Sequence, residues 1–296
     1  MSISHTLIAL LVAFLPAVTQ SPAPQDSGAA VRQWRAKHEE DYRRSYVSIV
    51  GLHELRPGAN TAGSAATNDV VLPASTPATI GRFLRDGLRV RFEPQSGVQV
   101  LLKGKPVTSA IELGDDSTRE PDELTIGRVR MVVHRSGGNP SIRVRDPEGP
   151  QAKNFAGFRW FPIDPKYRVS GRFIKDATPQ RLQVLNTYGG ADEYPSEGVV
   201  EFALLGQVLR LRPFTTRPGR CFFVFRDASS GHETYATARF LYSDLRDDGT
   251  TVLDFNMAYN PPCAFNRYTT CPIPLKENRL PVKILAGEMA YAGKLE

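Results

Sequence analysis

Apolar side chains recur at every second position through much of the chain, and this alternation limits the possible folds more than any other feature. Leu88, Val90 and Phe92 alternate with charged residues, and comparable short runs follow as far as residue 257. Successive side chains point to opposite faces of a strand, so the period predicts half-buried strands of antiparallel sheets. The 24 glycines and 23 prolines supply turns between the runs, and regularly spaced short strands favour sandwiches or barrels.

Two other patterns complete the predicted fold. Residues 221–225, Cys-Phe-Phe-Val-Phe, are apolar in both phases, which predicts a central strand that is covered on both sides. Near the start of the chain, Val31, Trp34, His38 and Tyr42 follow spacings of three and four residues, which predicts one amphipathic helix. The predicted fold class is therefore all-β: an N-terminal helix and a first β-sandwich, followed by a second antiparallel sandwich or barrel.

The chain divides into three predicted parts. Residues 1–23 resemble a signal peptide, because an apolar run over residues 7–15 precedes small residues and is too short for a comfortable membrane span. The helix and first sandwich occupy residues 30–146, and a β domain with a proline-rich cysteine loop occupies residues 155–296. The Pro- and Gly-containing loop between them lacks periodicity. We expect a secreted or periplasmic protein whose mature chain has no membrane span.

The charge balance narrows the classes of partner. The chain holds 37 Lys and Arg against 31 Asp and Glu, a formal charge of +6. Arg143 and Arg145 alternate with apolar neighbours, so we expect them on the solvent-facing side of a strand. This excess of positive charge has two interpretations: it keeps the protein soluble, or it attracts an anionic partner such as a small molecule or a glycan. Without a basic block or a stacking motif, nucleic acid is not expected as a partner, and we predict no cofactor.

Part of the first half resembles a known sandwich domain. The stretch RPGANTAGSAATNDVVLP, followed later by Lys103-Gly104-Lys105-Pro106-Val107, is similar to the forkhead-associated domain, which recognises phosphothreonine. The family's phosphate-binding arginine is Ser64 here, and Ser75 lacks the histidine that should follow it. Because phosphate recognition needs charged donors at these positions, we interpret this half as a scaffold without phosphopeptide binding.

The C-terminal half carries a more specific pattern. It reads FFVFRDASSGHETYATARFL and then VLDFNMAYNPPCAFNRYTTCPIPLKENRLPVKILAGE, with WRAKHEEDYRRSYVSIVGLHELRPGANTAGS and KNFAGFRWFPIDPKYRV before it. These segments resemble domain-of-unknown-function family 1684. The resemblance implies a largely β protein in two parts, often exported, and brings no established activity.

The three cysteines do not form a recognisable metal site. Cys263 and Cys271 are eight positions apart with no histidine nearby, whereas zinc sites need about four ligands at shorter spacings. In an oxidising compartment this pair predicts a disulfide, with free thiols as the alternative. Cys221 lies in the apolar run and is expected to be a buried, inert thiol. We predict no metal.

The run DASSGHETY places serines close to His232 but lacks the surroundings of a nucleophile. There is no Gly-x-Ser-x-Gly elbow, and side chains within one tight turn diverge rather than form a triad. We therefore predict a turn, followed by a strand over residues 233–242.

Polar and aromatic residues gather near the C-terminus, and we predict a candidate ligand site there. One interpretation is that they are buried hydrogen-bond partners that hold the proline-rich loop. The other is a polar pocket in which Arg239 and Arg279 hold an anionic or polar ligand between Tyr235 and Tyr259. The candidate residues are Glu233, Tyr235, Arg239, Asn256, Tyr259, Asn260, Asn278, Arg279 and Glu288.

The sequence favours an exported binding or scaffold protein with this pocket in its C-terminal β domain. Two alternatives stay open: a hydrolase that uses carboxylates of the same pocket, such as Glu233 and Glu288, and a protein–protein interaction module of the cell envelope. No residue is assigned a catalytic role, and the sequence leaves open whether the protein is an enzyme.

Overall fold

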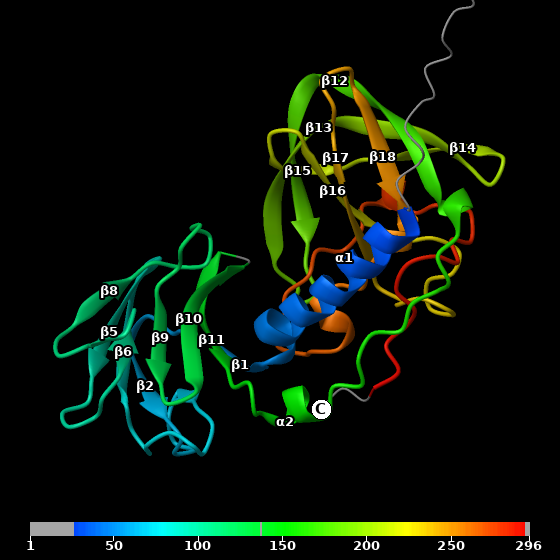
Figure 1. The fold of residues 1–296 in the computed structure, drawn as a ribbon. Coiled ribbons are helices and arrows are strands. Elements are labelled where there is room, and N and C mark those ends of the chain that lie inside the picture. The colour runs from blue at the N-terminus through cyan, green and yellow to red at the C-terminus, as the bar shows by residue number, and fades with distance from the viewer. Residues whose placement is uncertain (1–26, 137, 294–296) are drawn as a thin grey trace, which may run out of the picture.

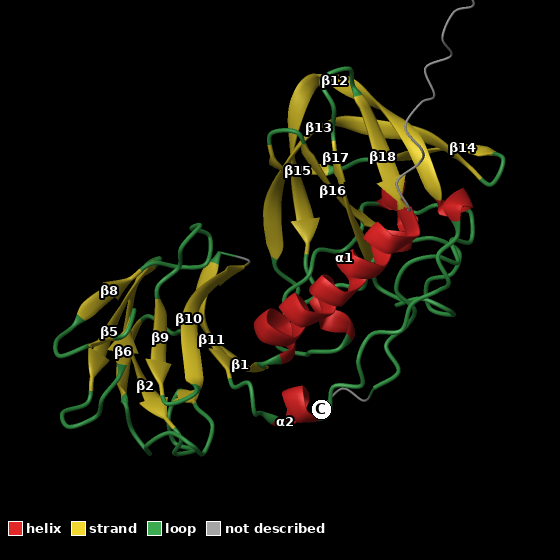
Figure 2. Cartoon of the chain, viewed as in Figure 1, coloured by secondary structure: helices red, strands yellow, loops and turns green. Residues whose placement is uncertain are grey.

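The structure is a computed structural model that describes residues 27–136 and 138–293. Within these residues the chain is mostly β, with one long helix near its start (Figures 1 and 2). The predicted fold class is confirmed: a first β-sandwich is followed by a second unit of two antiparallel sheets. The predicted signal peptide, residues 1–23, lies outside the described residues.

The first sandwich has two sheets around one core. Phe83 and Phe92 from one sheet meet Leu124, Ile142 and Val144 from the other, and all five are buried. Neighbouring strands are antiparallel except the short pair β2 and β3. In spatial order the sheets are β1 (Ile49–Glu54), β11 (Asn139–Arg145), β10 (Val129–Ser136), β9 (Glu123–Ile126), β6 (Leu101–Leu102), β7 (Lys105–Pro106), and β3 (Val70–Val71), β2 (Gly58–Gly63), β4 (Gly81–Asp86), β5 (Arg89–Pro94), β8 (Ile111–Leu113).

The C-terminal half also has two sheets, which enclose a second core of aromatic and aliphatic side chains. The strands that the structure describes do not join into a closed barrel, so the sandwich alternative holds. In spatial order the sheets are β14 (Gln207–Leu211), β13 (Ala191–Leu204), β12 (Arg168–Leu185), β18 (Thr250–Asp254), and β15 (Phe214–Arg217), β16 (Arg220–Phe225), β17 (Arg239–Asp244). The short helices are α2 (Pro150–Lys153), η2 (Pro165–Tyr167), η3 (Phe255–Met257), η4 (Pro262–Ala264) and η5 (Lys276–Asn278).

Strand β16 is covered on both faces, as its sequence predicts. Phe223 and Phe225 point into the core between the two sheets, whereas Phe222 and Val224 point to the opposite side. All four side chains are buried. The second side is covered by the N-terminal helix and by the segments that pack around Tyr259.

Helix α1 (Ser27–Tyr42), which continues as the π-helix η1 (Arg43–Val47), packs against the C-terminal half (Figure 1). Its predicted apolar stripe makes the contact: the rings of Trp34 and Trp160 are 5.9 Å apart, and those of His38 and Tyr259 are 4.5 Å apart. The chain therefore forms a helix on the C-terminal half, builds the first sandwich and then returns. The predicted boundaries near residues 146 and 155 stay a prediction.

The predicted strand over residues 233–242 is wrong at its start, because β17 begins at Arg239. The preceding residues form a compact set of turns instead. The amides of Glu233 and Thr234 both donate to the carbonyl of Ser229, whose hydroxyl lies 2.8 Å from that of Thr234. Hydroxyl side chains that bond locally compete with the hydrogen bonds of a sheet. Here the strand therefore begins only at Arg239.

Residues 263–271, which we call the cysteine loop, contact the first sandwich through Asn266. Its Nδ2 donates to the carbonyls of Tyr46 and Ile49 at 2.9 and 2.8 Å, and its Oδ1 accepts from the amide of Tyr268 at 2.8 Å. Asn266 is buried. One carboxamide thus joins the loop to the end of η1 and the start of β1.

We predict that Asn266→Ala lowers the free energy of unfolding by about 2–4 kcal/mol, because two enclosed carbonyls lose their donor. Urea unfolding measures the change. Asn68→Ala is the matched control: Asn68 also donates to two carbonyls, at 2.9 and 2.8 Å, but at a partly exposed site, so we expect a loss of about 1 kcal/mol. Equal losses in the two variants would contradict this role of Asn266.

Candidate functional site

A cleft of about 570 Å³ lies between helix α1 and strands β17 and β18. It is formed by segments that are far apart in the chain, because one wall comes from the helix and the other from the second half. Its lining residues are Ala30, Val31, Trp34, Arg168, Arg220, Leu241, Tyr242, Ser243, Asp244, Arg246, Val252, Asp254, Met257 and Tyr259.

The polar lining of this cleft carries an excess of positive charge. Its three arginines face two aspartates. Arg220 is 2.7 Å from Asp244, and Arg168 is 3.6 Å from Asp254. The guanidinium of the third, Arg246, donates to the Thr250 hydroxyl at 3.4 Å and forms no close ion pair in the described part of the chain, although, beside the hydrogen bonds from Thr250, its charge contributes to lowering the pKa of the exposed Asp248. Its guanidinium group is therefore available to an anion.

Aromatic rings form the apolar part of the cleft and fix one of the arginines. The guanidinium of Arg220 lies over the ring of Tyr242 at 4.9 Å, and that ring stacks on Phe222 at 4.6 Å. Trp34 and Tyr259 face the same space. Burial holds the pKa of Tyr259 well above its usual value, so its hydroxyl stays neutral. The cleft thus combines cationic groups with neutral, flat surfaces.

Behind Tyr259, two of the predicted site residues form a buried pair. The amide of Asn260 donates to one oxygen of Glu288 at 2.9 Å, and its Nδ2 donates to the other at 2.8 Å. Glu288 is 1% exposed. Burial raises the pKa of Glu288 to about 8, although the bonds from Asn260 and the charge of Arg239 act in the opposite direction.

Arg239 lies in the interior as a hydrogen-bond donor to the C-terminal segment. It is fully buried and forms an ion pair with Asp227 at 2.8 Å, which is fully buried as well. Its guanidinium also donates to the carbonyls of Ile284 and Ala286. These carbonyls are not paired with a neighbouring strand, so the arginine supplies the hydrogen-bond donors that such a strand would provide.

The other candidate residues lie in separate places. Asn256 bonds Asp164, and Asn278 bonds the backbone of Arg212 and Val224. Arg279 is exposed. Glu233 pairs with Lys283 at 2.7 Å, and the Tyr235 hydroxyl donates to the Cys263 carbonyl at 3.3 Å. Among the candidate residues, the structure therefore hydrogen-bonds Asn260 to Glu288, with the charge of Arg239 acting on Glu288, and places only Tyr259 in the cleft. Whether the remaining residues bind a ligand stays a prediction.

Sequence reasoning missed the three arginines of the cleft. Arg168 and Arg220 begin two different strands and Arg246 lies in the turn between β17 and β18, and no spacing between them distinguishes them from the many other arginines. Their convergence depends on the pairing of strands that are far apart in the chain, which places Arg168 opposite Asp254 and Arg220 opposite Asp244.

The cysteines are thiols in this structure, and no disulfide joins the described residues. Cys263 and Cys271 are nevertheless adjacent, since the amide of Cys263 donates to Sγ of Cys271 at 3.3 Å. The predicted disulfide stays a prediction. Cys221 is buried, as predicted, and burial raises the pKa of its thiol to about 11.

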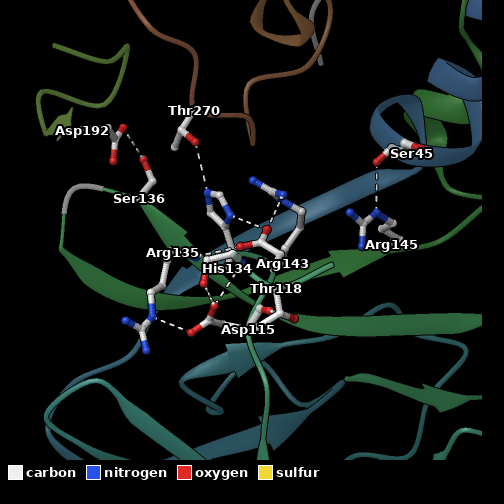
Figure 3. Close-up of polar contacts among 12 residues, drawn as sticks. Ser45, Asp115, Thr118, His134, Arg135, Ser136, Arg143, Arg145, Asp192 and Thr270 are labelled. Atoms are coloured by element: carbon white, nitrogen blue, oxygen red, sulfur yellow. Dashed lines mark hydrogen bonds and ion pairs between the residues drawn. The ribbon is translucent and has the colours of Figure 1, made fainter. Parts of the chain in front are cut away.

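A second polar cluster lies where the first sandwich meets the cysteine loop (Figure 3). His134 Nε2 is 3.1 Å from the Thr270 hydroxyl, and its Nδ1 is 2.6 Å from Asp116, which also accepts from Arg143 at 3.0 Å. The expectation that Arg143 faces solvent is wrong: it is 7% exposed. Arg145, which bonds the Ser45 carbonyl at 3.0 Å, is only partly exposed. The reason is that η1 and the cysteine loop cover this side of the sheet.

Across residues 27–136 and 138–293, no three His, Cys, Asp or Glu side chains gather as metal ligands would. None of the helices in the described portion is long and apolar enough to cross a membrane.

Comparison with known proteins identifies the family. Residues 153–289 match the family described as "Protein of unknown function (DUF1684)". An uncharacterized protein of Haloarcula marismortui, solved by solution NMR, is 30% identical over 49% of this chain and 82% of its own, with a TM-score of 0.41. The chain belongs to the DUF1684 family, as its sequence motifs indicated.

Two FHA-domain structures are also similar in part. One comes from work on phosphothreonine-dependent FHA domain interactions, and the other is the FhaA FHA domain in complex with an intracellular domain. Each is 19% identical over 31% of this chain, and over 79% and 85% of its own, with a TM-score of 0.22. The predicted resemblance is thus found among solved structures, and phosphothreonine recognition is a property of those proteins. Curated proteins gave no match.

We predict that Glu288→Gln flattens the pH dependence of stability between about pH 4.5 and pH 8. The folded pKa, about 8, exceeds the ordinary 4.5, so the stability due to the protonated group is complete below pH 4.5 and is lost as pH rises through 8. The span corresponds to about 5 kcal/mol at 1.36 kcal/mol per pKa unit.

Urea unfolding at a series of pH values measures this slope. The slope is the readout, rather than the absolute stability, because a glutamine places N–H groups against a donor of Asn260. Glu233→Gln serves as the control, since Lys283 lowers the pKa of Glu233 and its titration falls below this window. A wild-type slope in Glu288→Gln would show that Glu288 does not titrate there.

Proposed function

We propose that the protein is an exported binding protein that holds a small anionic ligand in the cleft beside helix α1. The proposal rests on the excess of positive charge in a cleft with aromatic walls. Three arginines and two aspartates line the cleft, together with Trp34, Tyr242 and Tyr259. Binding sites for small molecules combine apolar walls with a few convergent polar groups in this way.

The chemistry of the lining indicates the class of ligand. A guanidinium group recognises planar carboxylates and phosphates by paired hydrogen bonds, and the rings offer flat contact to an apolar or cyclic portion. Arg220 is held in place by Asp244 and by the ring of Tyr242, whereas the guanidinium of Arg246 donates only to a hydroxyl, at 3.4 Å, among the described residues. We therefore favour a compact carboxylate or phosphate that carries an apolar part.

Two features support binding rather than carboxylate-dependent hydrolysis. Glu288 is enclosed with Asn260 and does not line the cleft, and Glu233 is engaged by Lys283. The cleft's own carboxylates, Asp244 and Asp254, lie next to arginines. A carboxylate that is engaged by an arginine is not free to attack a substrate.

We predict a saturable rise in Tm when the mature protein is screened against inorganic phosphate, aliphatic and aromatic carboxylates, and acidic sugars. A ligand at 100 times its Kd adds about 2.7 kcal/mol to the free energy of unfolding. Arg246→Ala should remove most of this rise while changing the stability of the free protein by about 0.5 kcal/mol or less.

Arg210→Ala is the matched control, because Arg210 is an exposed arginine of β14 that pairs with Glu201 outside the cleft. It should keep the full rise. A screen without any saturable rise, or a rise that survives Arg246→Ala, contradicts the proposal. Export is supported by the apolar run at residues 7–15; cell fractionation of a bacterial host tests it, and an unprocessed chain in the cytoplasm contradicts it.

A further inference from the structure

The cysteine loop begins and ends with thiols that are in contact. The amide of Cys263 donates to Sγ of Cys271 at 3.3 Å, and the two thiols are hydrogen-bonded to each other. Prolines at positions 261, 262 and 272 flank the pair and restrict the backbone on both sides. The fold therefore holds the two sulfur atoms together without a covalent bond between them.

The two thiols differ in exposure. Cys271 is 1% exposed and belongs to the apolar cluster that contains Phe214 and Tyr259. Cys263 is partly exposed, and its sulfur lies 3.7 Å from the hydroxyl of Tyr235. A reagent from solvent therefore reaches Cys263 first.

The environment also separates the acidities of the pair. The hydrogen bond from Cys271 lowers the pKa of the Cys263 thiol, and the Tyr235 hydroxyl acts in the same direction. Burial raises the pKa of Cys271 well above its usual value, and the neighbouring sulfur of Cys263 raises it further. Because the thiolate is the attacking form, Cys263 is suited to attack and Cys271 to follow it.

We propose that Cys263 and Cys271 form a thiol–disulfide exchange site whose substrate is a small-molecule disulfide. The partial burial of Cys263 behind Tyr235 favours a small oxidant over a protein. This inference does not depend on the anion cleft, because neither cysteine lines it.

The exchange proceeds in two balanced steps. The Cys263 thiolate attacks one sulfur of the oxidant, so a mixed disulfide forms and the other half of the oxidant leaves as a thiolate, which takes up a proton. Cys271 then gives up its proton and attacks the sulfur of Cys263, displacing the second half as a thiol. Two protein thiols lose two electrons in total, and one small disulfide is reduced to two thiols.

The product disulfide closes the loop that meets the first sandwich. Asn266 and Thr270 lie between the two cysteines and bond the backbone near β1 and the imidazole of His134. Oxidation therefore restricts the conformations of the cysteine loop, which contacts the first sandwich.

The test treats the reduced, folded protein with oxidised glutathione, followed by an acid quench and peptide mass spectrometry. We expect the wild type to lose the thiols of Cys263 and Cys271 together without accumulating an adduct. In Cys271→Ser, a glutathione adduct should accumulate on Cys263. In Cys263→Ser, Cys271 should stay unmodified. Cys221→Ser is the matched control, since Cys221 is a buried thiol of β16, and it should behave as the wild type does.

Other outcomes overturn the proposal. These are an adduct on Cys271 or Cys221 that forms as fast as the one on Cys263, a stable adduct on Cys263 in the wild type, or an absence of reaction at both positions. If a serine variant fails to fold, brief alkylation of the reduced wild type with iodoacetamide decides the same question. Cys263 should be labelled first, and preferential labelling of either other cysteine refutes the assignment.

Discussion

The packing of helix α1 against the C-terminal half is the contact on which the other features depend. The helix presents Trp34, His38 and Tyr42 to rings from the second half, and His38 lies 4.5 Å from Tyr259. Arg35 adds polar anchors, because it donates to the carbonyls of Asn256 and Phe161 at 2.9 and 3.0 Å. Since Trp34 and Tyr259 also line the cleft, the same packing creates the wall of the proposed binding site.

The proline-rich C-terminal segments pose a different physical problem, since they pack without strand partners. Buried side chains supply the missing hydrogen bonds: Asn260 bonds Glu288, Asn266 bonds the segment before β1, and Asn278 bonds β16. Arg239 does the same for the carbonyls of residues 284 and 286. Most of the predicted polar residues thus form structural hydrogen bonds, and the proposed ligand cleft is lined by other residues apart from Tyr259.

The sequence predicted the features that depend on local periodicity. Apolar residues at spacings of three and four predict the helix, and apolar residues at every second position predict the sandwiches. The unbroken apolar run of residues 221–225 predicts that β16 is covered on both faces. Features that depend on packing between distant segments could not be predicted. Arg143 alternates with apolar residues like a solvent-facing side chain, yet η1 and the cysteine loop cover it. The predicted strand does not begin at residue 233 because the amides of residues 233 and 234 bond the Ser229 carbonyl in a turn. The cleft arginines converge only when distant strands pair.

The most direct test of this account is urea unfolding followed by tryptophan fluorescence and by far-UV circular dichroism. The chain has two tryptophans, Trp34 in the helix and Trp160 in the second half, and their rings are 5.9 Å apart. Their emission therefore reports the helix contact. If α1 is an integral part of the C-terminal core, the shift in emission will coincide with a cooperative loss of β signal. A red shift at urea concentrations that leave the β signal intact would show that the helix is only loosely attached, and would contradict the account.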